Sequence, residues 1–324
     1  MFETWVPLIA GLLLLVAGGE LLVRGAVQAA EQLGVSTLVI GLTLVGFGTS
    51  MPELVTSVQA GLSGAPGIAY GNIVGSNIAN ILLIGGISAL ICPVIVAETA
   101  LRRDALLMLG VAGLFATLAL MLPMGRFLGV GFVAGLVAYI VLAIRQERSS
   151  GEQGAIHDKS AALLQADPGL GRPSRYREQV LPLLLVLAGL GLVVMGGTLL
   201  VDGAVALARA IGIGERVIGL TIVAVGTSMP ELVTSVIAAL KRQGDVAFGN
   251  IVGSNIYNIL GIGGATALIA PGAVPGEIIA FDARLMVGVS VLLVVFAATG
   301  RRIDRREGLA LLVGYGAYLY MLWL

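Results

Sequence analysis

An acidic residue in the middle of an apolar run is the feature that most constrains this chain, and it occurs twice. Glu53 lies in GLTLVGFGTSMPELVTSV, and Glu231 lies in GLTIVAVGTSMPELVTSV. At a constant offset of 178, residues 41–86 and residues 219–264 are identical at 32 of 46 positions, without a gap. The chain therefore carries an internal duplication around two glutamates.

The duplication extends beyond this stretch. Residues 10–27 overlie residues 188–205 at the same offset, and Asp104 overlies Asp282. We expect each aspartate to be the N-cap residue that opens a helix.

The composition predicts a membrane protein. The chain of 324 residues has 57% hydrophobic and 12% charged residues and a mean hydropathy of +1.00, which is more apolar surface than a water-soluble core of this size can bury. A helix that crosses a membrane needs about 20 mainly apolar residues. The segments that meet this requirement are residues 5–30, 36–61, 68–92, 104–122, 126–144, 180–208, 216–240, 246–270, 282–299 and 306–324. The predicted fold class is an all-α membrane protein with ten transmembrane helices.

These spans divide into two halves of five. Residues 1–144 form the first half, residues 145–178 a polar linker, and residues 179–324 the second half. Because five is odd, the second copy must enter the membrane from the opposite side, which predicts two inverted five-helix repeats. With the N-terminus outside, fourteen Lys and Arg residues fall on one side of the membrane and four on the other. We therefore expect both termini outside and the linker in the cytoplasm.

The surroundings of the two glutamates predict an ion site. An ionised carboxylate inside a membrane is costly, and its usual role is to bind an ion or a proton. Thr49 and Ser50 precede the first glutamate within about one helical turn, and Thr227 and Ser228 precede the second. The proline before each glutamate removes a backbone hydrogen bond and frees carbonyl oxygens. Oxygen ligands without sulfur or imidazole favour a hard cation.

The next span of each half adds further polar residues. GNIVGSNIANIL and GNIVGSNIYNIL each place three of them at four-residue spacing, on one face of a helix. They are Asn72, Ser76 and Asn80 in the first half and Asn250, Ser254 and Asn258 in the second. The alternative is that these faces serve only helix packing, which is favoured most for Asn72 and Asn250. The corresponding alternative for the glutamates is that they are protonated or hydrogen-bonded between helices.

Other residues exclude several classes of site and partner. The net charge is zero and no dense basic block is present, which argues against nucleic acid. His157 is the only histidine and Cys92 the only cysteine, so a zinc or copper site is not expected, and no cofactor is predicted. Arg24 lies in the first span with Glu20 four residues before it, and we expect the two to neutralise each other.

The motifs GTSMPEL and GNIVGSNI, each present twice, resemble the two alpha-repeats of the cation/calcium antiporter superfamily, in particular its prokaryotic sodium/calcium exchangers. The resemblance implies a ten-helix fold in which the second, third, seventh and eighth spans surround the ion sites, while the long first and sixth spans slide together over the rest. The calcium ligands that it implies include Glu53, Glu231 and the carbonyl oxygens of Thr49 and Thr227. The sodium ligands that it implies are Ser50, Ser76, Ser228, Ser254 and the carbonyl oxygens of Gly46 and Ala224, and Asn80 and Asn258 complete the central site.

One departure from the family pattern concerns potassium. Some relatives carry Asp where this chain has Asn258, and in potassium-dependent exchangers that carboxylate is linked to potassium use. Asn at both equivalent positions, 80 and 258, therefore argues against potassium dependence. The resemblance also implies a prokaryotic inner membrane.

The leading hypothesis is a secondary antiporter that exchanges sodium for calcium by alternating access. Proton-coupled exchange is the close alternative, because a desolvated glutamate can carry protons. A passive cation channel would use the same oxygens as a filter, whereas an inverted repeat with broken helices favours a transporter. The chain is not expected to be an enzyme, since its spans hold no histidine. The expected partners are calcium and sodium ions and the lipid bilayer, and the sequence indicates no protein partner.

Overall fold

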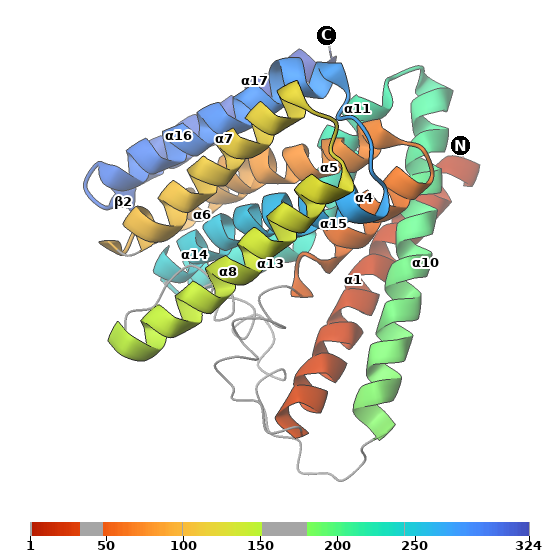
Figure 1. Ribbon diagram of the computed structural model, residues 1–324. Helices are drawn as coiled ribbons and strands as arrows, with labels where there is room; N and C mark the ends of the chain where they lie inside the picture. The colour runs from red at the N-terminus through yellow and green to blue at the C-terminus, as the bar shows by residue number, and fades with distance from the viewer. Residues whose placement is uncertain (1, 33–47, 99, 151–179, 243, 324) are drawn as a thin grey trace.

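The computed structural model is helical, as the predicted all-α class requires (Figure 1). It describes residues 2–32, 48–98, 100–150, 180–242 and 244–323. Most of the predicted linker and the first part of the predicted second span lie outside the described residues.

Helices of the first half follow the predicted spans closely. They are α1 (Phe2–Gln32), α4 (Met51–Leu62), α5 (Pro66–Ala79), η2 (Asn80–Ile84), α6 (Gly85–Ile91), η3 (Ala100–Ala105), α7 (Leu106–Met121) and α8 (Arg126–Ser150). The segments named η are π-helical turns that continue the α-helix beside them, so α5, η2 and α6 form one continuous helix from residue 66 to residue 91.

The second half has the same order. Its helices are α10 (Val180–Ile211), α11 (Glu215–Ile218), η5 (Gly219–Val223), α12 (Ala224–Thr227), α13 (Met229–Leu240), α14 (Gly244–Ile256), η6 (Tyr257–Gly263), α15 (Gly264–Ile269), η7 (Ile278–Asp282), α16 (Ala283–Ala298) and α17 (Arg305–Trp323). Two short strands, β1 (Val94–Ile95) and β2 (Arg302–Ile303), pair antiparallel, which the sequence did not indicate.

Seven helices among the described residues are long and apolar enough to cross a membrane. The bent pair of residues 215–227 and 229–240 forms an eighth such span. Of the two remaining predicted spans, residues 36–61 fall partly outside the described residues, and α17 opens with the charged residues Arg305, Arg306 and Glu307. The predicted spans and the helices agree in position wherever the structure describes them.

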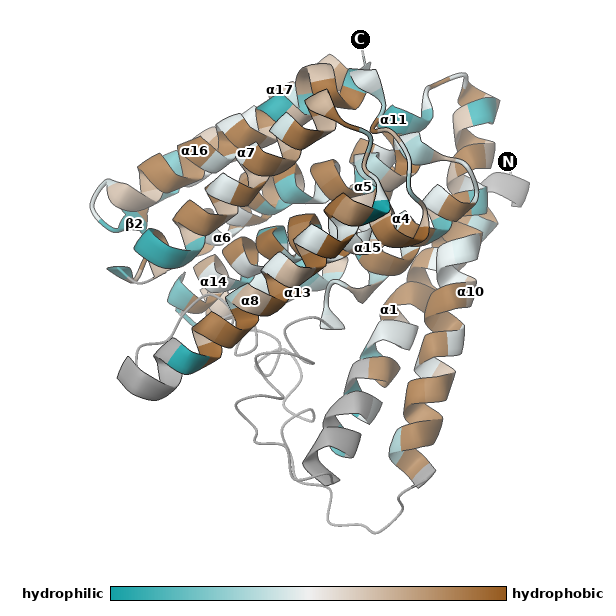
Figure 2. Cartoon of the chain, viewed as in Figure 1, coloured by the Kyte–Doolittle hydropathy of each residue, from teal (hydrophilic) through white to brown (hydrophobic). Residues whose placement is uncertain are grey.

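The helices differ strongly in how much of their surface the protein covers. In an apolar 18-residue stretch of the helices at residues 66–91 and 244–269, 83% and 89% of the stretch is buried. In the corresponding stretches of α1 and α10, the buried share is 28% and 33%. The peripheral helices consist largely of hydrophobic residues (Figure 2), and large hydrophobic side chains such as Leu13, Phe127 and Leu187 are exposed on them. The two buried helices therefore form the centre of the molecule, and the peripheral helices present apolar surface to lipid.

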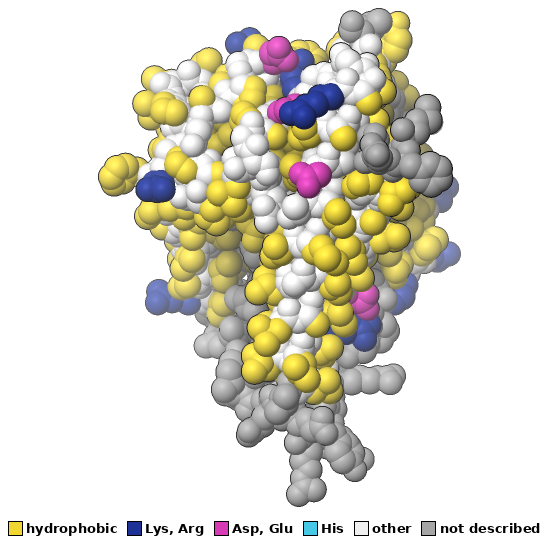
Figure 3. Space-filling model, turned by 90° about the vertical axis from the view of Figure 1, so that its right-hand side faces the viewer, with side chains coloured by type: hydrophobic (Ala, Val, Ile, Leu, Met, Phe, Trp, Pro, Cys, Tyr) yellow, Lys and Arg dark blue, Asp and Glu magenta, His cyan; other side chains and the backbone are white. Residues whose placement is uncertain are grey.

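Helices α1 and α10 lie side by side and extend together away from the other helices (Figure 1). On the face shown in Figure 3, hydrophobic side chains dominate the lower, narrow part, and acidic and basic side chains gather in the upper part. A Cβ atom on Gly11 would lie 2.7 Å from the carbonyl oxygen of Gly196, and one on Gly189 would lie 2.8 Å from that of Gly18. As the residue number of the contact increases along α1, from 11 to 18, the number of its partner on α10 decreases, from 196 to 189. The two helices therefore run antiparallel.

Contacts between the halves come in reciprocal pairs. Val94 in β1 pairs with Ile303 in β2, and an isolated bridge joins Met124 to Gly272. When the two halves are superposed in sequence, Val94 corresponds to Gly272 at an offset of 178 residues, and Met124 corresponds to Ile303 at an offset of 179 residues. The two contacts are therefore equivalent, with the halves exchanged. Helix α6 packs on α17 in the same way that α15 packs on α8. Each half therefore contacts the other through equivalent elements.

Candidate ion-binding site

Each glutamate lies just after a break in its helix. Helix α12 ends at Thr227 and α13 begins at Met229, and the two segments are bent by 49°. Ser228 at this break has φ −82° and ψ 9°, and Ser50 before α4 has φ −90° and ψ 7°. The proline at the second position of each new helix cannot donate a backbone hydrogen bond, which accounts for the break. The predicted interruption at both positions is confirmed.

The two breaks face each other. The Ser228 hydroxyl donates to Glu53 Oε1 over 2.9 Å, and the Ser50 hydroxyl donates to Glu231 Oε1 over 3.1 Å. All four side chains are at most 2% exposed. The serine of each half therefore holds the glutamate of the other half, and the two carboxylates belong to one site.

Asn72 and Asn250 hold the next helix against this site. The Asn72 amide donates to the Glu53 carbonyl oxygen over 3.1 Å and to Ser57 Oγ over 2.9 Å. The Asn250 amide donates to the Glu231 carbonyl oxygen over 3.2 Å and to two hydroxyls of α13. These bonds support the packing interpretation of both asparagines, because their donors are used between neighbouring helices.

The predicted serine and threonine residues reach the same region. Ser76 Oγ lies 3.4 Å from the Ala224 carbonyl oxygen, and Thr227 Oγ1 donates to Asn72 Oδ1 over 3.0 Å. Ser254 is fully buried on α14. Gly46, the position equivalent to Ala224, lies outside the described residues.

Among the predicted ligands other than the glutamates, three buried side-chain oxygens have no hydrogen-bond partner in the described part of the chain. They are Thr49 Oγ1, Asn80 Oδ1 and Asn258 Oδ1. Asn80 begins η2, which contacts α13, and Asn258 lies in η6, which contacts α4. The π-helical segment that holds each asparagine therefore contacts the helix that carries the glutamate of the other half. A buried oxygen without a donor is costly unless a cation or water binds it, and these donor atoms suit a hard cation.

The family model of the sodium/calcium exchanger proteins matches residues 3–145 and 181–324. This chain belongs to that family. The exchanger family comprises cation/calcium antiporters, so the chain is a cation/calcium antiporter and a multi-pass integral membrane protein. The predicted resemblance to the prokaryotic sodium/calcium exchangers is confirmed.

Several relatives align with almost the whole length of this chain. The putative antiporter CaxA of Alkalimonas amylolytica is 36% identical over 100% of this chain and 99% of its own. The sodium/calcium exchanger MaX1 of Methanosarcina acetivorans is 36% identical over 98% and 97%. Structures of the sodium-calcium exchanger NCX_Mj align with TM-scores of 0.62 and 0.63 at 31% and 32% identity, covering 98% of both chains.

The expectation that Asp104 and Asp282 open helices of this exchanger as N-caps is wrong. The helices begin earlier, so Asp104 lies inside η3 and Asp282 is the last residue of η7. Both side chains are fully buried. The Tyr139 hydroxyl donates to Asp104 Oδ1 over 3.0 Å, and the Tyr318 hydroxyl donates to Asp282 Oδ1 over 3.2 Å. Tertiary partners therefore hold both carboxylates, in place of the backbone N–H groups of a helix end.

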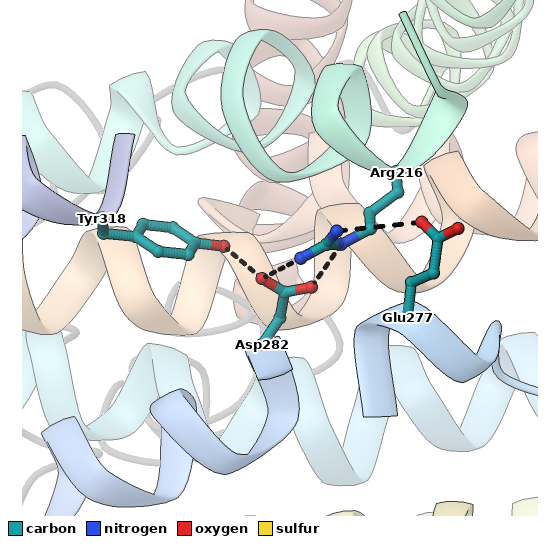
Figure 4. A network of polar contacts seen from close by, with 4 residues as sticks. All are labelled: Arg216, Glu277, Asp282 and Tyr318. Atoms are coloured by element: carbon teal, nitrogen blue, oxygen red, sulfur yellow. Dashed lines mark hydrogen bonds and ion pairs between the residues drawn. The ribbon is translucent and has the colours of Figure 1, made fainter. Parts of the chain in front are cut away.

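Arginine completes each of these two networks from a different place. Arg103 Nε, on the adjoining residue, lies 2.7 Å from Asp104 Oδ1. Arg216 Nε, from α11, lies 2.7 Å from Asp282 Oδ2, and Arg216 also approaches Glu277 at 3.7 Å (Figure 4). Sequence reasoning missed both networks because the tyrosine of each network, and Arg216 in the second, lie on a different helix from the aspartate. The pair of Glu20 and Arg24 was predicted correctly, with 2.6 Å between Arg24 Nη2 and Glu20 Oε1.

Proposed function

We propose that this antiporter exchanges sodium for calcium by alternating access, with Glu53 and Glu231 as the central cation ligands. The observation that carries the proposal is the crosswise pair of hydrogen bonds from Ser228 to Glu53 and from Ser50 to Glu231. These bonds bring two buried carboxylates from separate halves into one polar site. Such groups inside a membrane protein are typical of an ion pathway.

The proposed site offers enough oxygen atoms for calcium. Calcium takes six to eight oxygen ligands at about 2.3–2.6 Å. Two carboxylates can supply up to four, and hydroxyl, amide and backbone oxygens supply the rest. The set we propose is Gly46, Thr49, Ser50, Glu53, Ser76, Asn80, Ala224, Thr227, Ser228, Glu231, Ser254 and Asn258. The amide oxygens of Asn80 and Asn258, which accept no hydrogen bond in the described part of the chain, support this set.

Charge balance explains why the two ions compete. Two carboxylates carry two negative charges, which one calcium ion or two sodium ions neutralise. Moving an uncompensated charge through a low-dielectric region is costly, so the site reorients only when it is loaded. Relatives whose names record sodium/calcium exchange support sodium as the coupling ion.

The contacts between the halves support an inverted repeat of ten spans. Helices α1 and α10 occupy equivalent positions and run antiparallel, as two copies that enter the membrane from opposite sides would. We propose that both termini face outward, that the segment between the halves is cytoplasmic, and that the protein resides in a prokaryotic inner membrane.

Calcium-45 uptake into proteoliposomes tests the proposal. Vesicles loaded with sodium are diluted into sodium-free buffer, beside vesicles loaded with potassium or with acid. We expect uptake only from the sodium-loaded vesicles, and we expect Glu53→Gln and Glu231→Gln to abolish it. Glu20→Gln is the control, because Glu20 is about half exposed and pairs with Arg24 on α1. Uptake from the acid-loaded vesicles alone would establish proton coupling, and equal uptake in all three would indicate a passive channel.

A further inference from the structure

Two asparagines that lie off the predicted ligand face meet at the centre of the molecule. Asn77 and Asn255 occupy equivalent positions, 178 residues apart, on α5 and α14. Each is 1% exposed. They fall outside the four-residue spacing that marks the ligand face, and therefore the sequence pattern did not single them out.

The partners of Asn255 fix which way its amide points. Asn255 Nδ2 lies 3.5 Å from the Asn77 carbonyl oxygen and 3.5 Å from Met108 Sδ. A backbone carbonyl and a thioether can only accept hydrogen bonds, so the NH2 group of Asn255 must face them. The amide oxygen of Asn255 must then point the other way.

That oxygen determines the orientation of Asn80. Asn80 Nδ2 donates to Asn255 Oδ1 over 3.0 Å. The Asn80 amide oxygen is left without a donor in the part of the chain that the structure describes. The hydrogen bonds from Asn255 to the Asn77 carbonyl oxygen and from Asn80 to Asn255 therefore leave Asn80 Oδ1 available as an acceptor.

We infer that Asn255 is a positioning residue that makes Asn80 present its amide oxygen, and not its NH2 group, to the transported cation. The inference rests on the proposed function, in which Asn80 is a cation ligand. Without the acceptor at position 255, the Asn80 amide can turn and direct a donor at the cation. The same acceptor disfavours a carboxylate at position 80, because two oxygens would then meet at the 3.0 Å contact that a hydrogen bond now occupies.

The other half is built differently at the equivalent place. Asn77 Nδ2 donates to the Ile73 carbonyl oxygen of its own helix over 2.7 Å, and Asn77 Oδ1 receives no hydrogen bond from Asn258. Asn77 is therefore a matched control. It has the same residue type, the same burial and the equivalent position, without the orienting contact.

Calcium-45 exchange of reconstituted full-length variants tests the inference. Asn255→Ala is expected to raise the calcium KM about tenfold, the usual size of a lost supporting contact to a metal ligand. Asn77→Ala is expected to leave the calcium KM close to that of the unmodified protein. A calcium KM in Asn255→Ala as low as in the Asn77→Ala control would overturn the inference.

A second pair of variants separates orientation from mere packing. Asn80→Asp is expected to impair calcium transport relative to the unmodified protein, in which Asn255 is present. In the Asn255→Ala background, where no oxygen opposes the carboxylate, Asn80→Asp is expected to improve calcium transport relative to Asn255→Ala alone. If Asn80→Asp is equally harmful in both backgrounds, Asn255 does not act through the direction of the residue at position 80.

Asn80→Ala distinguishes failure of this inference from failure of the proposed function. An unchanged calcium KM in Asn80→Ala would remove Asn80 from the ligand set, and the inference would fail with it. A raised KM in Asn80→Ala together with an unchanged KM in Asn255→Ala would leave Asn80 a ligand and overturn only the positioning role.

Discussion

Ser228 donates a 2.9 Å hydrogen bond to Glu53, a residue 175 positions earlier in the chain. Ser50 makes the equivalent 3.1 Å bond to Glu231 in the opposite direction. Each half therefore contributes a hydrogen bond that orients the glutamate of the other half. A change in the distance between the halves would therefore alter both carboxylates at once. In the proposed mechanism, this would link ion binding to relative movement of the halves.

Removal of either serine hydroxyl should weaken calcium binding. A hydrogen bond to a charged group contributes about 1.5–3 kcal/mol, so Ser228→Ala and Ser50→Ala should each raise the calcium KM by roughly ten- to a hundredfold. Calcium-45 exchange in proteoliposomes measures this. Ser290→Ala is the control, since Ser290 is buried but donates within its own helix, to the Met286 carbonyl oxygen. A serine variant no worse than this control would contradict the prediction.

The ion pair between Arg216 and Asp282 should contribute strongly to stability. Asp282 is fully buried, so Arg216→Met leaves a buried carboxylate without its cation, a change that typically costs about 3–5 kcal/mol. Thermal unfolding of the detergent-purified protein should show a large drop in Tm. Arg102→Met, which breaks an exposed pair with Glu98, should cost about 0–1 kcal/mol. Similar Tm values for the two variants would refute the stabilising role of the pair of Arg216 and Asp282.

The close packing of α1 on α10 should tolerate no side chain at its contact glycines. A Cβ atom on Gly189 would collide with the backbone nitrogen of Leu22, whereas one on Gly191 would meet no atom within 4 Å. Gly189→Val should therefore destabilise the protein by about 1–3 kcal/mol through overpacking. Gly191→Val, on the same helix, should change the Tm little. The comparison fails if the two variants unfold at the same temperature.

Asp304 should give the start of α17 a pH dependence. Its carboxylate accepts hydrogen bonds from the backbone N–H groups of Glu307 and Arg306, and the Asp304 N–H group donates to the Glu307 carboxylate. The bonds from these backbone groups lower the pKa of Asp304. Because the folded-state pKa is lowered, this stabilisation is present above the ordinary aspartate pKa of about 3.9 and is lost as the pH falls through the folded-state value.

Asp304→Asn tests this pH dependence, because an asparagine keeps the cap but does not titrate. The difference in Tm between the unmodified protein and Asp304→Asn should shrink as the pH falls below about 4. A difference that is constant between pH 3 and pH 7 would contradict the role of the ionised carboxylate.

Much of the architecture could be predicted from the sequence, because its signals are local or repetitive. The apolar runs predicted the positions of the helices, since a segment inside a membrane must satisfy its backbone N–H and C=O groups by hydrogen bonds within itself, as a helix does. The duplication identified Glu53 and Glu231 as equivalent, and the proline before each of them predicted the break. The pairing of Glu20 with Arg24 followed from a four-residue spacing on one helix.

Only the tertiary structure decided which groups meet across helices. The bond from Ser228 to Glu53, the pair of Arg216 with Asp282, and the contact of Asn80 with Asn255 join residues 175, 66 and 175 positions apart. Periodicity along one helix shows which residues share a face, but it carries no information on the neighbour that this face contacts. For the same reason Asp104 and Asp282 were predicted as N-caps, whereas a tyrosine and an arginine bind each of them in the fold. The sequence by itself determined a duplicated membrane protein with two central glutamates, and the packing of its halves determined how those glutamates form one site.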